Sequence, residues 1–304
     1  MTKAPLILAA LLPYVSSAGG PIRIALAGDA QAVARARVLV DGRPLPAGGQ
    51  LSAEDYPAQH CVRIEGEGVY VHHWNAVGPR YRYPQLDDSF WVVGSPDATN
   101  AVTHTATLTT HAVWVDPKGG RDAPEAAGTA DDPFRTLVYA AQRAEKTSVV
   151  FCAPGDYAEG EAFYASVTNR VHDFNKALFF RGCGADRCRL VGRLDPTDPE
   201  DGRGPAAIRC AAFQNAASAL QGFTVADGRV SSTTGKADAG NQGGAGFNVN
   251  FVDCTITNCA AARGQVGRGG SVTRCRIVGN TVANTEGGRL FEDTCPVYSS
   301  ICFR

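Results

Sequence analysis

The stretch that decides the fold lies at residues 114–192. It opens with WVDPKGGRDAPEAAGTADDPFRTLVYAAQRA (114–144), continues with SVVFCAPGDYAEG (148–160) and closes with KALFFRGCGADRCRLVG (176–192). The opening piece has the pattern of one short helix, whereas the next two are brief β-rich segments bounded by turn residues. A helix followed by short strands with turns between them predicts a chain that coils upward in small steps, as a β-solenoid does.

The helix is predicted to begin near Asp132, which can cap its first turn, and Pro133 can take the first helical position. A solenoid has an open hydrophobic end that must be covered. We therefore expect this helix to cover the first coil. Its apolar residues recur at i, i+3, i+4 and i+7 and so form one stripe: Phe134, Leu137, Val138 and Ala141.

Short strand cores recur further along the chain, at 223–225, 254–256, 275–277 and 295–297. Their first residues are 31, 21 and 20 positions apart. A nearly constant period with one insertion is typical of stacked coils. The longest interval contains SSTTGKADAGNQGGAG (231–246), which we expect to leave the coil as a loop.

The predicted fold class is all-β, in two parts. Residues 113–304 are predicted to form a right-handed parallel β-helix with the short capping helix at its start, and residues 19–112 a small β-rich module before it. The alternative is an antiparallel β-sandwich, which would show two-residue hairpins, and few follow residue 146. The chain stops within the repeat pattern at 300–304, so we expect further coils in a longer protein.

Within the module, AVARARVLVDGRPLP (32–46) predicts a strand followed by a hairpin. Alternate residues from Ala34 to Val40 are apolar, and Asp41-Gly42 is a turn signal. Further strand candidates follow, so we expect a small antiparallel β module.

Residues 1–18 have the pattern of a secretory signal peptide. Lys3 precedes an apolar stretch, and Ser16 and Ala18 supply small residues before Gly19. The stretch is too short to span a bilayer, and no other segment of the sequence is suited to crossing one. The alternative is a buried first strand or helix of the folded protein. We expect a secreted or cell-surface protein.

The residues that open the repeat also carry a family resemblance. In order they are VDP (115–117), GG (119–120), GT (128–129), DPFRTL (132–137) and APGDY (153–157). Over roughly residues 113–304 the chain resembles the pectate-lyase-like right-handed parallel β-helix superfamily, whose secreted bacterial members commonly begin in this way. The resemblance implies an extracytoplasmic protein that binds or acts on polysaccharide. It implies no single reaction, because the superfamily includes lyases, hydrolases, epimerases, esterases and non-catalytic surface proteins.

From this resemblance we expect a glycan-binding or adhesive surface solenoid that engages polysaccharide. The alternative is a polysaccharide lyase or a glycoside hydrolase acting on an acidic polysaccharide, and a purely structural role also stays open. The 29 Lys and Arg residues nearly balance the 30 Asp and Glu residues, so no global field attracts nucleic acid. The sequence does not indicate the oligomeric state.

Arginine supplies the predicted substrate contacts. Elimination on a uronic polymer needs a cation that neutralises the carboxylate and a base, often Arg or Lys. Arg274 and Arg276 are two positions apart, so we expect them to point the same way from one strand and to grip an anionic chain. Arg263 and Asp227 complete the predicted substrate-binding set. The alternative is a solvated β face with ordinary surface arginines.

A possible calcium site lies in LDPTDPEDGRG (194–204). Calcium prefers several oxygen ligands from a flexible loop. The alternative is a plain polar turn rich in Pro and Gly. Four carboxylates stand close together here: Asp195, Asp198, Glu200 and Asp201.

Two other arrangements are candidates for acid–base chemistry. Hydrolysis of a glycosidic bond needs two carboxylates a few ångström apart, and His172 beside Asp173 is a possible acid–base pair. Turn-forming Asp is the alternative explanation for the carboxylates. Those near predicted strand ends are Asp227, Asp253, Glu292 and Asp293.

The ten cysteines do not settle the redox state. Cys183 and Cys188 bracket a Gly-containing loop and are the predicted disulfide. Buried, unpaired thiols that fill the solenoid interior are the expectation for Cys210, Cys254 and Cys275.

Overall fold

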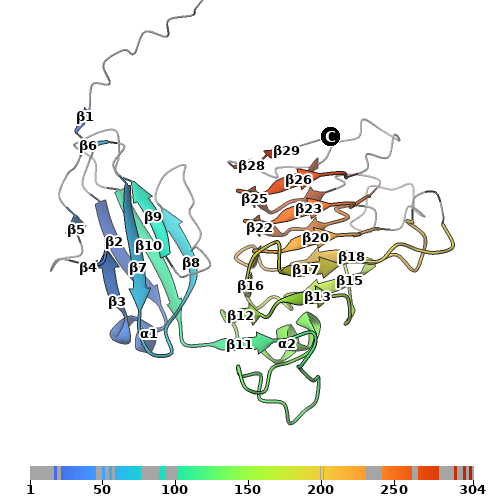
Figure 1. Cartoon of the computed structure of the whole chain (residues 1–304), viewed down its shortest axis with the longest axis horizontal. Helices are drawn as coiled ribbons and strands as arrows, with labels where there is room; N and C mark the ends of the chain where they lie inside the picture. The colour runs from blue at the N-terminus through green and yellow to red at the C-terminus, as the bar shows by residue number, and fades with distance from the viewer. Residues whose placement is uncertain are drawn as a thin grey trace, which may run out of the picture.

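The chain folds into a module of short β-sheets followed by a solenoid, as the computed structural model in Figure 1 shows. The structure describes residues 17–18, 22–45, 50–51, 55–56, 59–76, 89–93, 102–198, 200, 202–230, 242–261, 266–280, 291–292, 297–298 and 301–302. Within these ranges no helix is both long and apolar enough to cross a bilayer.

The module packs two four-stranded sheets around one apolar core. The sheets have the orders β5-β2-β10-β8 and β4-β3-β7-β9, and β1 pairs with β6. Strands β2 and β10 run parallel, so the module is not wholly antiparallel as predicted. Val62, Val71 and Trp74 are buried between the sheets. The strands are β1 (Ser17–Ala18), β2 (Ile22–Gly28), β3 (Arg37–Val40), β4 (Arg43–Pro44), β5 (Gln50–Leu51), β6 (Asp55–Tyr56), β7 (Gln59–Glu65), β8 (Tyr70–Ala76), β9 (Ser89–Val93) and β10 (Val102–Thr109).

The strand predicted from Ala34 onward is wrong in its first half. Residues Ala30–Arg35 form helix α1, and strand β3 begins only at Arg37. Asp29 caps this helix, because its carboxylate accepts two backbone N–H groups of the first turn at 2.8 and 3.0 Å. The predicted hairpin is confirmed: β3 and β4 pair across Asp41 and Gly42, whose φ angles are 50° and 78°.

The solenoid confirms the predicted parallel architecture. We call its three sheets the first (β11-β12-β16-β19-β22-β25-β28), the second (β13-β17-β20-β23-β26-β29) and the third (β14-β15-β18-β21-β24-β27). Neighbouring strands are parallel in every described pair except β14 with β15. The first-sheet strands are β11 (Ala112–Val115), β12 (Val149–Cys152), β16 (Phe179–Gly182), β19 (Ala219–Gln221), β22 (Asn250–Val252), β25 (Ser271–Thr273) and β28 (Val297–Tyr298).

Each coil visits the three sheets in this order, and the loops that follow the second sheet are the longest. The second-sheet strands are β13 (Gly155–Tyr157), β17 (Cys188–Val191), β20 (Thr224–Ala226), β23 (Thr255–Thr257), β26 (Arg276–Val278) and β29 (Ile301–Cys302). The third-sheet strands are β14 (Ala162–Tyr164), β15 (Val167–His172), β18 (Arg209–Ala212), β21 (Gly246–Phe247), β24 (Gly267–Arg268) and β27 (Phe291–Glu292).

The predicted register holds for three of the four strand cores. Thr224, Thr255 and Arg276 are direct neighbours across the second sheet, which confirms the alignment of 223–225, 254–256 and 275–277. The fourth core is misplaced, because Val297 pairs with Val272 in the first sheet. The neighbour of Arg276 in the next coil is Ile301, so this coil is 25 residues long.

Helix α2 (Leu137–Arg143) lies at the lower end of the solenoid, and its predicted apolar stripe is buried. It begins later than predicted. Its N-cap is Thr136, whose hydroxyl accepts the N–H of Tyr139 at 3.2 Å. Asp132 instead pairs with Arg121 at 2.9 Å and accepts the N–H of Ala127. Asp132 therefore fixes the bend before the helix.

Candidate functional site

The outer face of the third sheet is the candidate site. Strands β15 and β18 of this sheet lie on the side of the solenoid away from the module (Figure 1). His172, Ala212, Phe247 and Arg268 are aligned across consecutive coils in one row. A side chain at the neighbouring Gly246 would meet Phe251 in the core, so the row that contains Phe247 faces outward.

An aromatic stack forms the lower part of this face. The ring of Tyr164 lies against His172, with centroids 4.2 Å apart and planes at 32°. Phe174 meets the same imidazole edge-on at 4.7 Å. Tyr164 and Phe174 are half-buried, whereas His172 is buried between them. The adjacent Phe163 on β14 is 77% exposed.

Phe247 lies between two guanidinium groups in the coils above. The guanidinium carbons of Arg209 and Arg268 are 5.3 and 5.7 Å from its ring centroid. Each contact is within the range of a cation–π interaction, which contributes about 0.5–2 kcal/mol depending on burial. Arg209 is fully buried and Arg268 is half-buried, so only Arg268 brings its charge near the surface.

Arg209, the first residue of β18, is buried below this surface and holds the loop that precedes β21. It donates to the carbonyls of Gly243 and Gln242 at 3.0 and 2.8 Å and to Oδ1 of Asn169 at 3.2 Å. Burial lowers the pKa of Arg209 to about 9, against a smaller opposing contribution from Tyr164. The group therefore stays a cation at neutral pH while its donors hold the loop that precedes β21.

His172 is a neutral group in this setting. Burial lowers its pKa, and attraction to Asp173 offsets part of that shift. Its Nδ1 accepts the backbone N–H of Phe174 at 3.3 Å, so the neutral ring carries its proton on Nε2. Nε2 lies 3.8 Å from Oδ1 of Asp173. In this tautomer Nε2 can donate a hydrogen bond but cannot act as a base, which leaves the predicted acid–base role of His172 without support.

Arg274 and Arg276 do not share a strand, contrary to the prediction. Arg274 has φ of 51° and lies at the corner between β25 and β26, whereas Arg276 is the first residue of β26. Arg274 donates to both carboxylate oxygens of Asp253 at 2.7 Å, in the coil below. This bidentate pair joins adjacent coils and occupies the guanidinium that was predicted to contact substrate.

Asp227 and Arg276 lie at the second sheet. Asp227 pairs with Arg189 at 2.7 Å and accepts from Nδ2 of Asn258 in the next coil at 2.6 Å. Both Asp227 and Asn258 have φ near 50–60°, the left-handed conformation that Asp and Asn tolerate. Arg276 is exposed on the outer face of β26. Arg263 lies outside the described residues.

In the described part of the predicted calcium loop, two of the carboxylates accept hydrogen bonds from nearby backbone N–H groups. Asp195 accepts the N–H of Thr197 at 2.8 Å and of Ala206 at 2.7 Å, and Asp198 accepts the N–H of Arg203 at 2.9 Å. No group of three or more His, Cys, Asp or Glu positioned for a metal occurs among the described residues. Glu200 is exposed, and Asp201 lies outside the described ranges. The calcium site stays a prediction.

Of the four candidate carboxylates for hydrolysis, the structure describes two, Asp227 and Asp253, and these lie apart. Asp227 follows β20 and Asp253 precedes β23, so they lie at opposite ends of second-sheet strands. Each is paired with an arginine. The side chain of Glu292 and the whole of Asp293 are outside the described part of the structure.

Among the described residues of the solenoid, three pairs of cysteines are neighbours: Cys183 with Cys188, Cys210 with Cys259, and Cys254 with Cys275. The Sγ atoms of Cys183 and Cys188 are 3.0 Å apart as free thiols, and burial raises the pKa of Cys188 to about 12. Their disulfide stays a prediction. Cys210, Cys254 and Cys275 are buried and none of the three is in a disulfide, as expected. Their interior positions make them small apolar fillers.

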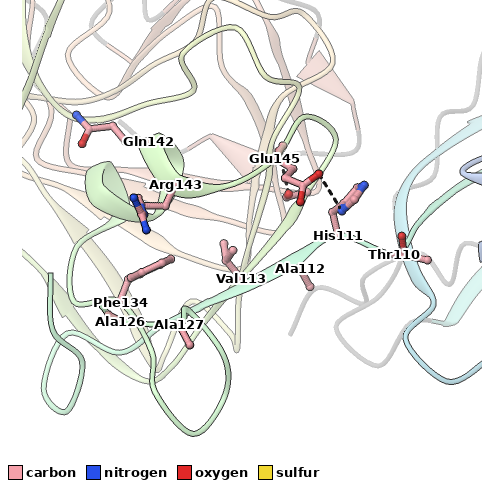
Figure 2. Close-up of a pocket in the computed structure, with 11 residues that line it drawn as sticks. Thr110, His111, Ala112, Val113, Ala126, Ala127, Phe134, Gln142, Arg143 and Glu145 are labelled. Atoms are coloured by element: carbon pink, nitrogen blue, oxygen red, sulfur yellow. Dashed lines mark hydrogen bonds and ion pairs between the residues drawn. The ribbon is translucent and has the colours of Figure 1, made fainter. Parts of the chain in front are cut away.

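A separate cavity of about 430 Å³ lies at the foot of the solenoid (Figure 2). Arg143 at the end of helix α2 and the ring of Phe134 line one part of it, and His111 pairs with Glu145 at 3.4 Å in another. The polar side chains around it are largely exposed. We assign this open cavity no ligand.

The residues of the third-sheet face were missed by sequence reasoning. Tyr164, Arg209 and Phe247 are far apart in the chain and meet only because coils stack. One local signal was present: in GFNV (246–249) the glycine faces inward, so the phenylalanine beside it faces outward. An outward-facing Phe in a solenoid coil is a reason to suspect a binding surface.

These features define the class of protein as a parallel β-solenoid with an aromatic and cationic outer face. No family model matches the chain, and no curated protein matches it. A solved structure described as a rhamnogalacturonan lyase is similar with a TM-score of 0.38 and 18% identity over 63% of this chain. The chain spans 50% of that structure's length. A likeness at this level does not transfer a function.

Proposed function

We propose that this protein engages an acidic polysaccharide, with the sugar chain lying along the outer face of the third sheet. The observation that carries the proposal is Phe247, an aromatic ring set between coils with the guanidinium of Arg268 beside it. The guanidinium groups of Arg209 and Arg268 already lie over this ring, so a sugar would meet the rest of its exposed surface, and a uronic acid adds a carboxylate that pairs with arginine. Tyr164 and Phe174 lie two coils below, past the buried Ala212.

The shape of the solenoid supports a polymeric ligand. Coils repeat at about 4.8 Å, so equivalent positions recur in a line along the sheet. A polymer can contact several positions of such a line at once, and linked weak contacts add up to strong binding. The described part of the module contacts the first sheet, whereas β15 and β18 of the third sheet lie on the far side of the solenoid (Figure 1).

Cleavage by elimination is the second candidate function. We favour it over hydrolysis because three described carboxylates are engaged in ion pairs with arginine. Asp227, Asp253 and Glu161 each pair with an arginine, at 2.7, 2.7 and 3.1 Å. A hydrolase needs two carboxyl groups a few ångström apart around the scissile bond, whereas Asp227 and Asp253 lie at opposite ends of second-sheet strands. Elimination needs instead a base and a group that neutralises the uronate, and Arg268 is placed for the second role.

The first experiment is calorimetric titration with polygalacturonate and with its methyl ester, in calcium and in EDTA. We expect binding of the acid form and at least tenfold weaker binding of the ester. Phe247→Ala and Arg268→Gln should each weaken binding about tenfold, the size of a strong contact residue. Arg276→Gln, on the second sheet, is the matched control and should bind as wild type.

The outcomes separate the candidates. Unchanged binding in both Phe247→Ala and Arg268→Gln, or loss of binding in Arg276→Gln, would reject the third-sheet face. Ultraviolet absorbance from a new carbon–carbon double bond in the product would establish elimination, and new reducing ends without it would establish hydrolysis. Alginate, hyaluronan and rhamnogalacturonan extend the panel to other acidic polymers.

We also propose that the protein acts outside the cytoplasm, on the strength of the N-terminal pattern. N-terminal sequencing of exported protein should begin near Gly19. An intact Met1 would contradict the proposal.

A further inference from the structure

The module contacts the first sheet of the solenoid through strand β8. The ring of Tyr70 lies edge-on to Trp114 and Phe151, with centroids 6.1 and 5.4 Å apart. Arg181 on β16 donates to the carbonyl of Val71 at 2.9 Å. Val149, Phe179 and Ala219 pack with Tyr70 and Phe151 into one apolar cluster. The interface is therefore a specific, partly apolar contact between two folded parts.

Two adjacent histidines on β8 form a hydrogen-bonded chain that ends in the solenoid. Nε2 of His72 donates to the carbonyl of Ala177 at 2.5 Å. A carbonyl only accepts, so neutral His72 accepts at Nδ1. Nδ1 of His73 lies 2.9 Å from that atom and therefore donates, and its Nε2 accepts from the hydroxyl of Thr107 at 3.3 Å. Each of these bonds has one donor and one acceptor when both rings are neutral.

We propose that His72 and His73 form a pH-sensitive latch that keeps the module docked on the first sheet while both rings are neutral and releases it when they are protonated. Protonation acts in two steps. When the first proton binds, a shift of the His73 tautomer can keep every hydrogen bond of the chain, since the Thr107 hydroxyl can accept as well as donate. The first proton nevertheless leaves a charged imidazolium buried in the interface. A second proton places two N–H groups face to face at 2.9 Å, where neither can accept.

The groups around His72 oppose a positive charge there. His73 on the same strand and Arg181 on β16 are the charged or titratable groups that act on it, and both disfavour its protonation. Across the interface, the segment 173–177 offers the Ala177 carbonyl. Its Lys176 ammonium donates to carbonyls at the end of helix α2, and its Asp173 accepts donors of the next coil. No carboxylate acts on His72 among the described residues.

The direction of the pH effect follows from proton binding. Burial, His73 and Arg181 lower the pKa of His72 from its ordinary 6.5 to about 4, and burial lowers the pKa of His73. The docked state thus binds fewer protons than the released state, where both rings are exposed. Docking is strongest above the ordinary pKa and weakens as pH falls toward the docked value. For His72 alone the docking equilibrium falls about tenfold per pH unit, or roughly 300-fold over this window.

The test is small-angle X-ray scattering of the full chain from about pH 7.5 to about pH 4.5, with far-ultraviolet circular dichroism on the same samples. We expect the radius of gyration to rise as pH falls while the β signal stays constant. His72→Gln keeps a donor toward Ala177 without a titratable ring. It should stay compact to a pH at which the wild type has opened, with at least a tenfold smaller open population.

Controls make the test decisive. His60→Gln removes a histidine that pairs with Asp41 inside the module at 2.7 Å, and it should open like the wild type. If His72→Gln does not fold, His73→Gln serves in its place and should flatten the pH dependence. A constant radius down to the lowest pH, opening of the variant at the wild-type pH, or loss of the β signal together with the expansion would each overturn the latch.

Discussion

Asp173 is the residue whose removal tests the construction of the candidate face most directly. Its carboxylate is fully buried and accepts the backbone N–H groups of Gln214 and Asn215 at 2.8 and 2.9 Å. It also accepts the Ser218 hydroxyl at 2.6 Å and the N–H of Asn175 at 3.2 Å. One side chain thus joins the turn after β15 to the turn of the next coil, directly beside the stack of Tyr164, His172 and Phe174.

The size of the effect can be worked from these bonds. A hydrogen bond to a charged group contributes about 1.5–3 kcal/mol. In Asp173→Ala, the N–H groups of Gln214 and Asn215 lose an acceptor that no side-chain rotation replaces, whereas the Ser218 hydroxyl can turn to another partner. Counting the two N–H groups in full, we expect the free energy of unfolding to fall by about 4 kcal/mol. Asp173→Asn keeps one accepting oxygen and should lose about 2 kcal/mol.

Urea unfolding followed by circular dichroism measures both values. Asp131→Ala is the control, because Asp131 is exposed in the bend before helix α2, and it should stay within about 0.5 kcal/mol of wild type. An Asp173→Ala variant within about 1 kcal/mol of wild type would refute the reasoning, since the buried carboxylate would then not hold the coils together.

Two corner positions give further predictions, both measured by thermal and urea unfolding. Gly270 has φ of 69°, and a Cβ there would lie 2.2 Å from the Val249 carbonyl oxygen, so Gly270→Ala should lose about 3 kcal/mol. Gly279→Ala has a similar φ of 64° but its nearest atom is 3.6 Å away, so it should lose only about 1 kcal/mol; equal losses would contradict the clash. Arg274→Ala should lose about 1 kcal/mol with its ion pair, whereas Arg274→Gly should be close to neutral because glycine relieves about 1 kcal/mol of left-handed strain. Both Arg274 variants should bind polygalacturonate as wild type, and a loss of binding would restore the original substrate role of Arg274.

Features whose position depends only on spacing along the chain could be predicted from the sequence. The apolar stripe of helix α2 and the register of Thr224, Thr255 and Arg276 follow from spacing alone, because burial must recur once per turn or once per coil. Asp227 next to Asn258 was also predictable, since both residue types tolerate the left-handed corner.

Prediction failed where a corner interrupts the strand pattern. Arg274 adopts φ of 51°, which is uncommon for a residue with a long side chain. The two-residue spacing from Arg276 therefore wrongly predicted that both side chains point the same way from one strand. The last coil is longer than its predecessor, so Val297 was assigned to the wrong sheet. Neither deviation can be read from the adjacent sequence, because each depends on which residues of the neighbouring coil are available for pairing.

The candidate face and the module interface were beyond prediction for a different reason. Phe247 meets Arg209 across a coil, and His72 meets Ala177 from 105 positions away. Such contacts depend on how coils stack and on where the module docks, and neither follows from spacing within one segment. They are also where the structure departs from simple packing rules: a fully buried arginine and two facing histidines.

The buried Arg209 belongs to the third sheet, whereas His72 and His73 face the first sheet from strand β8. The two proposals therefore concern different sides of the solenoid. The latch acts through the first sheet, where β8 meets Phe151, Phe179 and Arg181. The candidate face is on the third sheet, and the buried pair Phe180 and Phe213 lies in the core. A closely packed interior resists small displacements, so release of the module from one face need not disturb the other. The latch can therefore fail while polysaccharide binding stands, and the reverse holds equally, because no residue named in one experiment contributes a contact to the other.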